Sequence, residues 1–350
     1  MPDQERLLHE NAALVALLNT VDKKKGDTWT SIAEKVERQG SAIDVYMHEL
    51  DPQHHQLNDD DEDSYDASSD GALFSEEDLP VTEERKRQLT LALSVANRQV
   101  LDWEREGLNF ISVLDPRYPL RLREVVDMPP FLFEKGNFNE IDDSDKGVSI
   151  VGSRKASSEA LSFAADVSSM LVERCMTVIA GLAAGVDSAA HRQALDEGGR
   201  TVAFIGTGIT KSYPAKNRDL QEEIESRGQV FSQFWPWQGP TKWTFPARNA
   251  SMSGYGVATV IVEAGEYSGT RVQARQAQHH GRPIILRDKV VEQTKWGNRL
   301  ANRPNVYVAS SVADVSRYVD AILQSDIKME NTIKKMIADA TDDANQHRMK

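Results

Sequence analysis

The chain has 350 residues, of which 40% are hydrophobic and 27% charged, a composition typical of globular proteins with a sizeable apolar core. It contains no stretch of about 18 or more apolar residues, so we expect no membrane span. The start, Met1-Pro2-Asp3, lacks the basic and apolar regions of a secretory leader, and the single cysteine, Cys175, excludes an intrachain disulfide. These features predict a cytoplasmic protein in which Cys175 is buried in an apolar run.

The net charge of −13 is unfavourable for binding nucleic acid, but it is unevenly distributed along the chain. Between Glu49 and Asp78 there are 12 acidic residues and no lysine or arginine. Removing these twelve carboxylates from the total of −13 leaves −1 for the rest of the chain. Basic patches can therefore exist elsewhere, and the charge does not exclude a polyanionic ligand.

The first part of the chain is predicted to be helical with an acidic interruption. In residues 1–48 leucines recur at helical spacing, which indicates a helical N-terminal module. Residues 49–80 are rich in Asp and Ser and poor in apolar residues, so we expect a disordered insert that acts as a solvated spacer. Residues 81–109 return to a helical pattern, which Gly107 is placed to end.

From Phe110 onward short apolar runs alternate with amphipathic stretches. This alternation predicts a parallel sheet covered on both faces, and hence an α/β fold with a Rossmann-like, doubly wound, mostly parallel sheet over residues 110–325. We expect residues 326–350 to form a polar tail, either helical or frayed. The predicted strands are Phe110–Val113, Phe131–Glu134, Val148–Val151, Met176–Ala180, Thr201–Ile205, Gln229–Gln233, Thr259–Val262, Pro283–Leu286 and Val306–Val308.

In such sheets ligands bind beyond the carboxyl ends of the strands, so we expect the functional residues in the loops there. The loop Gly152-Ser153-Arg154 joins a strand to a helix, where free backbone N–H groups and an arginine fork favour an anion such as phosphate over a plain turn. After the next strand, Asp187 can cap a helix and His191 lies one turn further on. A metal site there would need a third ligand that the sequence does not place, so we expect no metal, a structural cap by Asp187, and a His191 that is either packed or faces a ligand.

Three later loops add candidate contacts. The segment Gly206-Thr207-Gly208 lacks the third glycine of a dinucleotide fingerprint, and no Walker A sequence occurs, but Lys211 and Lys216 add positive charge. In the segment 242–249, bases alternate with aromatic residues, which suits a single-strand binder, although aromatic residues near strands are often core. The segment Ser268-Gly269-Thr270 is either an anion nest or an ordinary helix cap.

These loops, in this order, resemble the DNA-processing protein A (DprA, or Smf) family. The resemblance covers roughly residues 110–286 and rests on an ordered set of motifs. The motifs are Asp115-Pro116-Arg117-Tyr118-Pro119, Pro129-Pro130, Lys135-Gly136-Asn137, Gly152-Ser153-Arg154, Gly181-Leu182-Ala183-Ala184-Gly185-Val186-Asp187, Ala190-His191, Gly206-Thr207-Gly208, Tyr213-Pro214, Asn217, Phe245-Pro246-Ala247-Arg248-Asn249 and Ser268-Gly269-Thr270.

The resemblance implies a non-catalytic, sequence-independent single-stranded DNA binding protein that forms a homodimer and helps to load a RecA-type recombinase in DNA uptake and recombination, without a cofactor. By position, Arg154 would grip phosphate, Lys216 and Lys242 would contact the backbone, and Phe245 would stack on a base. The chain departs from the family at Ala250, where a second arginine is usual. The candidate DNA- and phosphate-binding residues are Gly152, Ser153, Arg154, Lys211, Lys216, Lys242, Phe245, Arg248, Asn249, Ser268, Gly269 and Thr270.

Three alternatives remain open at the level of sequence. The Gly-Thr loop is also similar to that of cytokinin-activating phosphoribohydrolases, but Gln273 stands where their catalytic glutamate would be and cannot act as a carboxylate base. A sensor that binds a nucleotide in the same crevice, or a defence-associated relative, would have a similar sequence. We therefore predict no catalytic residues.

Overall fold

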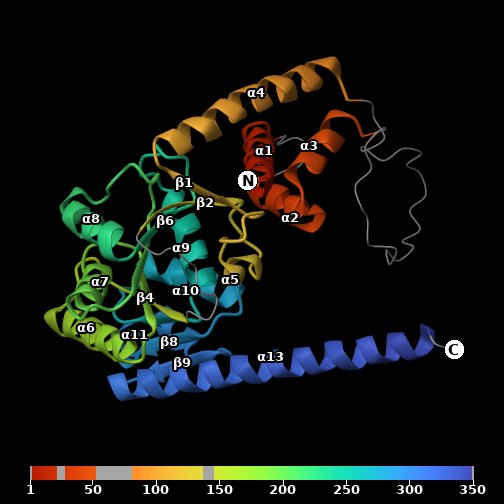
Figure 1. The fold of residues 1–350 in the computed structure, drawn as a ribbon. Helices are drawn as coiled ribbons and strands as arrows, with labels where there is room; N and C mark the ends of the chain where they lie inside the picture. The colour runs from red at the N-terminus through yellow and green to blue at the C-terminus, as the bar shows by residue number, and fades with distance from the viewer. Residues whose placement is uncertain (1, 22–27, 53–80, 137–145, 349–350) are drawn as a thin grey trace. The chain divides into compact units, whose positions relative to one another are not determined.

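The computed structural model describes residues 2–21, 28–52, 81–136 and 146–348 (Figure 1). Most of the expected acidic insert, residues 53–80, lies outside the described residues. The chain forms two compact units. The first comprises Met1–Asp142, Thr207–Lys211 and Phe231–Gly239, and the second comprises Asp143–Gly206, Ser212–Val230 and Pro240–Lys350.

Helices dominate the first unit, and polar side chains define their ends. The hydroxyl of Thr28 accepts the backbone N–H of Ser31, and the Ser31 hydroxyl accepts that of Thr28, which forms a capping box. Ser41 caps the next helix, and the buried carboxylate of Glu10 accepts the N–H groups of Ala42 and Ile43 there. The helices are α1 (Pro2–Asn19), α2 (Trp29–Gln39), α3 (Ala42–Leu50) and α4 (Glu83–Arg105), followed by the short α5 (Leu120–Arg123).

An aromatic cluster joins these helices to two strands. Strand β1 (Asn109–Ser112) pairs antiparallel with β2 (Phe131–Gly136). The ring of Trp103 on α4 lies 5.3 Å from that of Phe110 and 5.0 Å from that of Phe133. Because β1 and β2 bury their aromatic side chains against α4, they belong to the first unit, which differs from the expected domain boundary at residue 110.

The second unit is built around a parallel sheet. Strands β5-β4-β3-β7-β8-β9 are neighbours in that order and pair in parallel, and β6, which follows β5 in the strand order, has residues in both units. The strands are β3 (Gly147–Val151), β4 (Thr177–Ala180), β5 (Thr201–Phe204), β6 (Gln229–Ser232), β7 (Ala258–Ile261), β8 (Ile284–Arg287) and β9 (Val306–Ala309). Successive strands run outward from β3 in one direction and from β7 in the other, so the crevice of this doubly wound sheet lies between β3 and β7.

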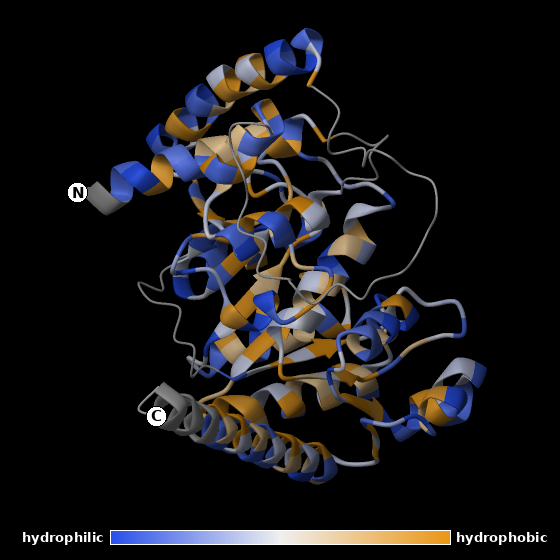
Figure 2. Ribbon diagram, turned by 90° about the vertical axis from the view of Figure 1, so that its right-hand side faces the viewer, coloured by the Kyte–Doolittle hydropathy of each residue, from blue (hydrophilic) through white to orange (hydrophobic). Residues whose placement is uncertain are grey.

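Helices cover both faces of this sheet. Val148 and Ile150 of β3 pack into the core beneath α6, α7 and α13, while Ser149 donates to the carbonyl of Met252 on α9, on the other face. Polar and apolar residues accordingly alternate along the helices (Figure 2). The helices are α6 (Ser158–Glu173), α7 (Val186–Asp196), the 3₁₀ helix η3 (Ala215–Asn217), α8 (Arg218–Arg227), α9 (Thr244–Tyr255), α10 (Thr270–His279), α11 (Asp288–Gln293), α12 (Lys295–Leu300) and α13 (Val312–Arg348).

The predicted α/β fold with a Rossmann-like, mostly parallel sheet is confirmed, and each predicted strand overlaps an observed one. Helix α13 continues without a break from Val312 to Arg348, which is the helical one of the two forms expected for the polar tail. One detail differs from expectation. Cys175 is exposed, because it occupies the tight turn between α6 and β4 with a φ of 55°. In the described part of the chain, no helix is long and apolar enough to cross a bilayer.

Candidate nucleic-acid interface

The loops after β3 and β4 are held against each other beneath an exposed arginine. A Cβ atom on Gly152 would lie 2.6 Å from the Val186 side chain, so only glycine fits there. Gly185 has a φ of +83°, and a Cβ on it would lie 2.3 Å from the carbonyl oxygen of Ser153. The Ser153 hydroxyl accepts the N–H of Lys155 and tightens the turn. This packing leaves the Arg154 side chain exposed on a well-defined loop.

The guanidinium of Arg154 lies over an aromatic ring. Its Cζ is 5.6 Å from the centroid of the Phe245 ring, within the range of a cation–π contact. The centroids of the Tyr213 and Phe245 rings are 5.7 Å apart. Gly206 leaves room for the Phe245 ring, since a Cβ on Gly206 would come within 2.7 Å of it. Phe245 is half-buried and Tyr213 is 43% exposed. A cation and two partly exposed rings therefore meet in the second unit.

Two predicted lysines are presented on anchored segments. Lys216 is exposed on η3, and its neighbour Asn217 is buried and donates to the carbonyl of Leu182 and the hydroxyl of Ser188. Lys242 is exposed in the turn before α9, where Thr241 and Thr244 exchange backbone-to-hydroxyl hydrogen bonds. Fixed backbone beneath long cationic side chains suits contacts to a phosphate chain.

The prediction that Arg248 contacts phosphate is wrong. Its side chain is 6% exposed, donates to the carbonyl of Phe204, and fills the space that Gly181 leaves. Burial lowers the pKa of Arg248, and the carboxylate of Asp187 opposes that shift. Arg248 is thus a structural arginine whose positive charge lies below the surface, because the motif places it on the buried face of α9.

Asp187 and His191 are likewise structural. Burial raises the pKa of Asp187, which Arg248 and the N–H groups of Gly181 and Ala183 counteract. Asp187 therefore braces the loop before α7, instead of capping that helix as expected. His191 is fully buried, and its Nδ1 lies 2.7 Å from the hydroxyl of Thr201. Burial lowers the pKa of His191 to about 3, so the ring is neutral.

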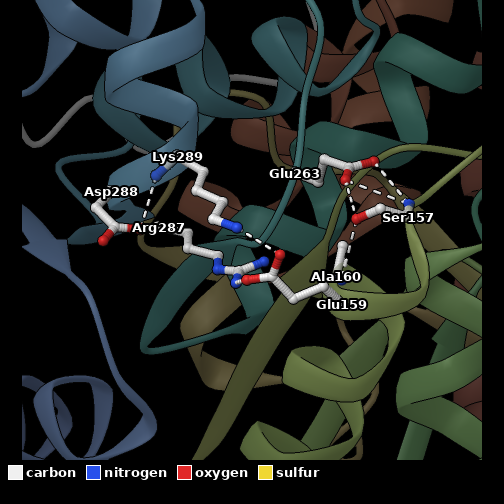
Figure 3. Close-up of polar contacts among 7 residues, drawn as sticks. All are labelled: Ser157, Glu159, Ala160, Glu263, Arg287, Asp288 and Lys289. Carbon is white, nitrogen blue, oxygen red and sulfur yellow. Dashed lines mark hydrogen bonds and ion pairs between the residues drawn. The ribbon is translucent and has the colours of Figure 1, made fainter.

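The helix start after Gly152-Ser153-Arg154 holds a carboxylate of the protein itself. Ser157 caps α6 by accepting the N–H of Ala160, and its hydroxyl donates to Glu263 Oε2 at 2.6 Å (Figure 3). The backbone N–H of Ser157 also donates to Glu263, 3.3 Å away. The N–H of Ser157 at this helix start is therefore taken by Glu263, which follows β7, and is not open to a phosphate.

A second internal pairing lies beyond β8. The carboxylate of Glu159, in the first turn of α6, accepts hydrogen bonds from both Arg287 and Lys289 (Figure 3). These two partners lower the pKa of Glu159. The guanidinium of Arg287 also lies 4.6 Å from the ring centroid of Phe163. The charges at this end of the sheet are thus paired within the protein, in contrast to Arg154.

The loop before α10 uses the polar groups of Ser268-Gly269-Thr270 in hydrogen bonds of its own. The Ser268 hydroxyl accepts the N–H of Thr270, and the N–H groups of Arg271 and Val272 bond to carbonyls within the loop. Thr270 is 7% exposed. The hydroxyl of Ser268 is thus bonded within the loop and Thr270 is buried, which disfavours the expected anion nest at these two residues, while Gly269, the N-cap of α10, remains exposed and supplies no side-chain cap.

The same loop presents an aromatic residue that sequence reasoning missed. Tyr267 is 95% exposed, although the residues on both sides are anchored: Glu266 accepts the N–H of Lys295, and the Ser268 hydroxyl accepts the N–H of Thr270. Trp243, beside Lys242, is 55% exposed and was noted only as part of an aromatic run. The available signal was an aromatic residue in a loop that follows the carboxyl end of a strand.

The remaining predicted residues are less informative. Lys211 is exposed and belongs to the first unit, whereas the other exposed candidates belong to the second. Asn249 is half-buried on α9. Ala250, which stands where the family usually has arginine, is 4% exposed and therefore has no access to a ligand.

The part of the chain that carries these loops matches a known protein family. The model of the family "DNA recombination-mediator protein A" matches residues 109–320, more than half of the chain. The chain belongs to this family. The expected resemblance to DprA and Smf proteins is thereby confirmed, over a region that includes all the exposed candidate residues.

The chain is also similar in sequence to individual DprA and Smf proteins. The DNA processing protein DprA of Streptococcus pneumoniae is 38% identical over 174 residues, which are 50% of this chain and 61% of that protein. The protein Smf of Synechocystis is 33% identical over 184 residues, 52% of this chain and 46% of that protein. The DprA of Bacillus subtilis is 28% identical over 188 residues, 54% of this chain and 63% of that protein. The chain thus spans less than two thirds of each relative.

Two solved structures share the fold. The X-ray structure of DprA from Streptococcus pneumoniae has a TM-score of 0.57 and 30% identity, and covers 66% of this chain and 81% of that one. The DprA of Helicobacter pylori has a TM-score of 0.54 and 21% identity, and covers 61% of this chain and 95% of that one. At that identity the second likeness establishes only the fold.

Proposed function

We propose that the chain binds single-stranded DNA without sequence preference through the exposed candidate residues of its second unit. The observation that carries the proposal is the contact of Arg154 with Phe245, since it places a phosphate-binding group beside a ring that can stack on a base. Lys216 and Lys242 add cations on anchored backbone. The Helicobacter pylori relative was described for its single-stranded DNA binding mode, which supports this choice of ligand.

The kinds of side chain present account for the lack of sequence preference. Guanidinium and ammonium groups recognise phosphates, which are the same in every nucleotide, and aromatic rings stack on any base. The exposed and half-buried candidates supply these two kinds of contact: cations from Arg154, Lys216 and Lys242, and rings from Phe245 and Tyr267. Binding is therefore expected to depend strongly on salt and weakly on sequence.

In this proposal the protein holds DNA and performs no reaction on it. Gln273 replaces the carboxylate that nucleotide hydrolysis would need, and it is 1% exposed. Glu263 occupies the helix start where a nucleotide phosphate would bind in a doubly wound fold, which also disfavours a nucleotide sensor. Family membership supports the wider role: a cytoplasmic homodimer that delivers single strands to a RecA-type recombinase.

Fluorescence anisotropy with labelled oligo-dT, oligo-dC and a duplex of equal length tests the proposal. We expect tight binding of both single strands at low salt, with affinities within a few-fold of each other, and weaker binding of the duplex. Equal affinity for the duplex, or no binding of either single strand at low salt, would contradict it.

A further inference from the structure

Helix α13 is one continuous helix whose beginning and later part differ in burial (Figure 1). Near its start, Val315, Val319 and Ile322 are buried in the core of the second unit. Every residue from 327 to 337, by contrast, is exposed. The core of the unit therefore fixes the start of α13 and leaves three turns of the same helix in solvent.

The exposed part of α13 carries large apolar side chains on one face. Met329, Ile333 and Met336 are 63%, 50% and 66% exposed. Met329 follows the buried Ile322 by seven residues, and Ile333 and Met336 follow at steps of four and three, so all of them lie on the same face of the helix. Ile337 lies on the flank of this face and is also exposed. The face that packs into the core thus continues as an apolar stripe in solvent.

Such a stripe indicates a surface that another molecule covers, because an exposed helix is normally polar on its solvent side. Apolar residues at alternating steps of four and three form the seam of a coiled coil, which fits a second helix of the same spacing. The same segment of a second copy meets this requirement, because a two-fold axis brings identical surfaces together. Pairing would bury Met329, Ile333 and Met336 of both copies.

Asp326 determines the direction of such a pair. It occupies the stripe position between Ile322 and Met329. In a parallel pair the two Asp326 carboxylates would face each other across the seam, which like charges disfavour. In an antiparallel pair with Met329 of each copy opposite Ile333 of the other, each Asp326 lies opposite Met336 instead. The two carboxylates are then at opposite ends of the paired segment.

The charges beside the stripe also favour the antiparallel arrangement. Glu330 and Lys334 are exposed and lie one turn apart on the same flank of the stripe. An antiparallel pair brings this flank against the same flank of the second copy. Glu330 of each copy then lies near Lys334 of the other, which gives two opposite-charge pairs related by the two-fold axis.

We propose that residues 326–337 of α13 form a homodimer interface in which two copies pair as antiparallel helices. The proposal rests on the homodimer of the proposed function and assigns its surface. The interface lies beyond residues 109–320, which match the family model, and it contains none of the candidate DNA-binding residues.

Sedimentation equilibrium of the full chain tests the interface. We expect a dimer for the unmodified chain and a dissociation constant at least tenfold higher for Ile333→Glu, which places a carboxylate in the seam. Asn331→Glu adds the same charge on the opposite side of the helix and should dimerise as the unmodified chain does. Both positions are exposed, so neither change should disturb folding.

The outcomes separate this interface from the other parts of the account. A dimer that Ile333→Glu leaves intact would overturn the α13 interface and retain the homodimer. A monomeric unmodified chain would overturn both. Anisotropy with oligo-dT on the same samples tests DNA binding independently of either result.

A charge exchange tests the antiparallel direction. Glu330→Lys should raise the dissociation constant of the dimer severalfold, because it places a lysine near Lys334 of the other copy. Adding Lys334→Glu to the same chain restores opposite charges across the interface and should return the dissociation constant to that of the unmodified chain. Failure of the second change to restore dimerisation would overturn the antiparallel arrangement.

Discussion

The guanidinium of Arg154 lies 5.6 Å from the centre of the Phe245 ring, although the two residues are 91 positions apart in the chain. Arg154 follows β3 and Phe245 lies in the first turn of α9, so the fold brings them together. The nearby charge of buried Arg248 adds to the positive potential at this point, as its effect on Asp187 indicates. The pair thus combines the two interactions that a single-strand binder needs.

Replacing the ring of Phe245 should weaken DNA binding. Phe245→Ala removes a stacking surface worth about 1–3 kcal/mol, so affinity for oligo-dT should fall about tenfold or more. Phe245→Tyr retains the ring and should bind within a few-fold of the unmodified chain. Anisotropy measures both, and equal binding by Phe245→Ala would exclude the ring from the interface.

Tyr267 offers a cleaner test of stacking because it is 95% exposed. Tyr267→Ala should lower affinity for oligo-dT about tenfold, while the free energy of unfolding in urea changes by less than about 0.5 kcal/mol. Tyr267→Phe is the control and should retain affinity. If Tyr267→Ala binds DNA normally, this loop does not take part.

Arg248 should matter for stability and not for salt-dependent binding. Arg248→Met leaves the buried carboxylate of Asp187 without its nearby positive charge, so the free energy of unfolding should drop by about 3 kcal/mol. Arg192→Met, at an exposed position on α7, is the control and should change it by less than about 0.5 kcal/mol. An Arg248→Met chain of normal stability that binds DNA with a shallower salt dependence would return Arg248 to the interface.

His191 should make the protein sensitive to mild acid. Burial lowers its pKa to about 3 from an ordinary value of 6.5, so the unfolded chain takes up a proton before the folded one does. Its contribution is therefore complete above pH 6.5 and is lost as the pH falls from 6.5 towards 3, by up to about 1.4 kcal/mol per pH unit. Urea unfolding should show that the free energy of unfolding falls less between pH 7 and pH 5 in His191→Leu than in the unmodified chain. An equal fall in both chains would contradict this role of His191.

The strands could be predicted because each is a short apolar run in a sheet buried on both faces, as in Val148–Val151. The exposure of Arg154 and Lys216 also followed from their place in loops. The burial of Arg248 could not be predicted, because it depends on the space that Gly181, 67 residues away, leaves for the guanidinium. The binding of Glu263 at the start of α6 could not be predicted either, because Glu263 and Ser157 are 106 residues apart in the chain.

The exposure of Tyr267 was missed for a related reason. An aromatic residue in a sequence is most often part of a core, and only the anchoring of its neighbours, through Glu266 and Ser268, leaves this ring in solvent. The strands and the motif residues could thus be predicted from sequence patterns, whereas contacts between distant residues determine which motif residues are exposed.

We infer that Arg154 contacts phosphate in a single-strand site that tolerates any sequence. The most direct test is the affinity for oligo-dT across a series of salt concentrations, for the unmodified chain, Arg154→Ala and the exposed control Arg192→Ala. We predict that Arg154→Ala binds more weakly at every salt concentration and that its slope of log K against log salt is shallower by about 0.7, the value for one phosphate contact on a single strand. Identical affinity and slope for Arg154→Ala and the unmodified chain would contradict the account.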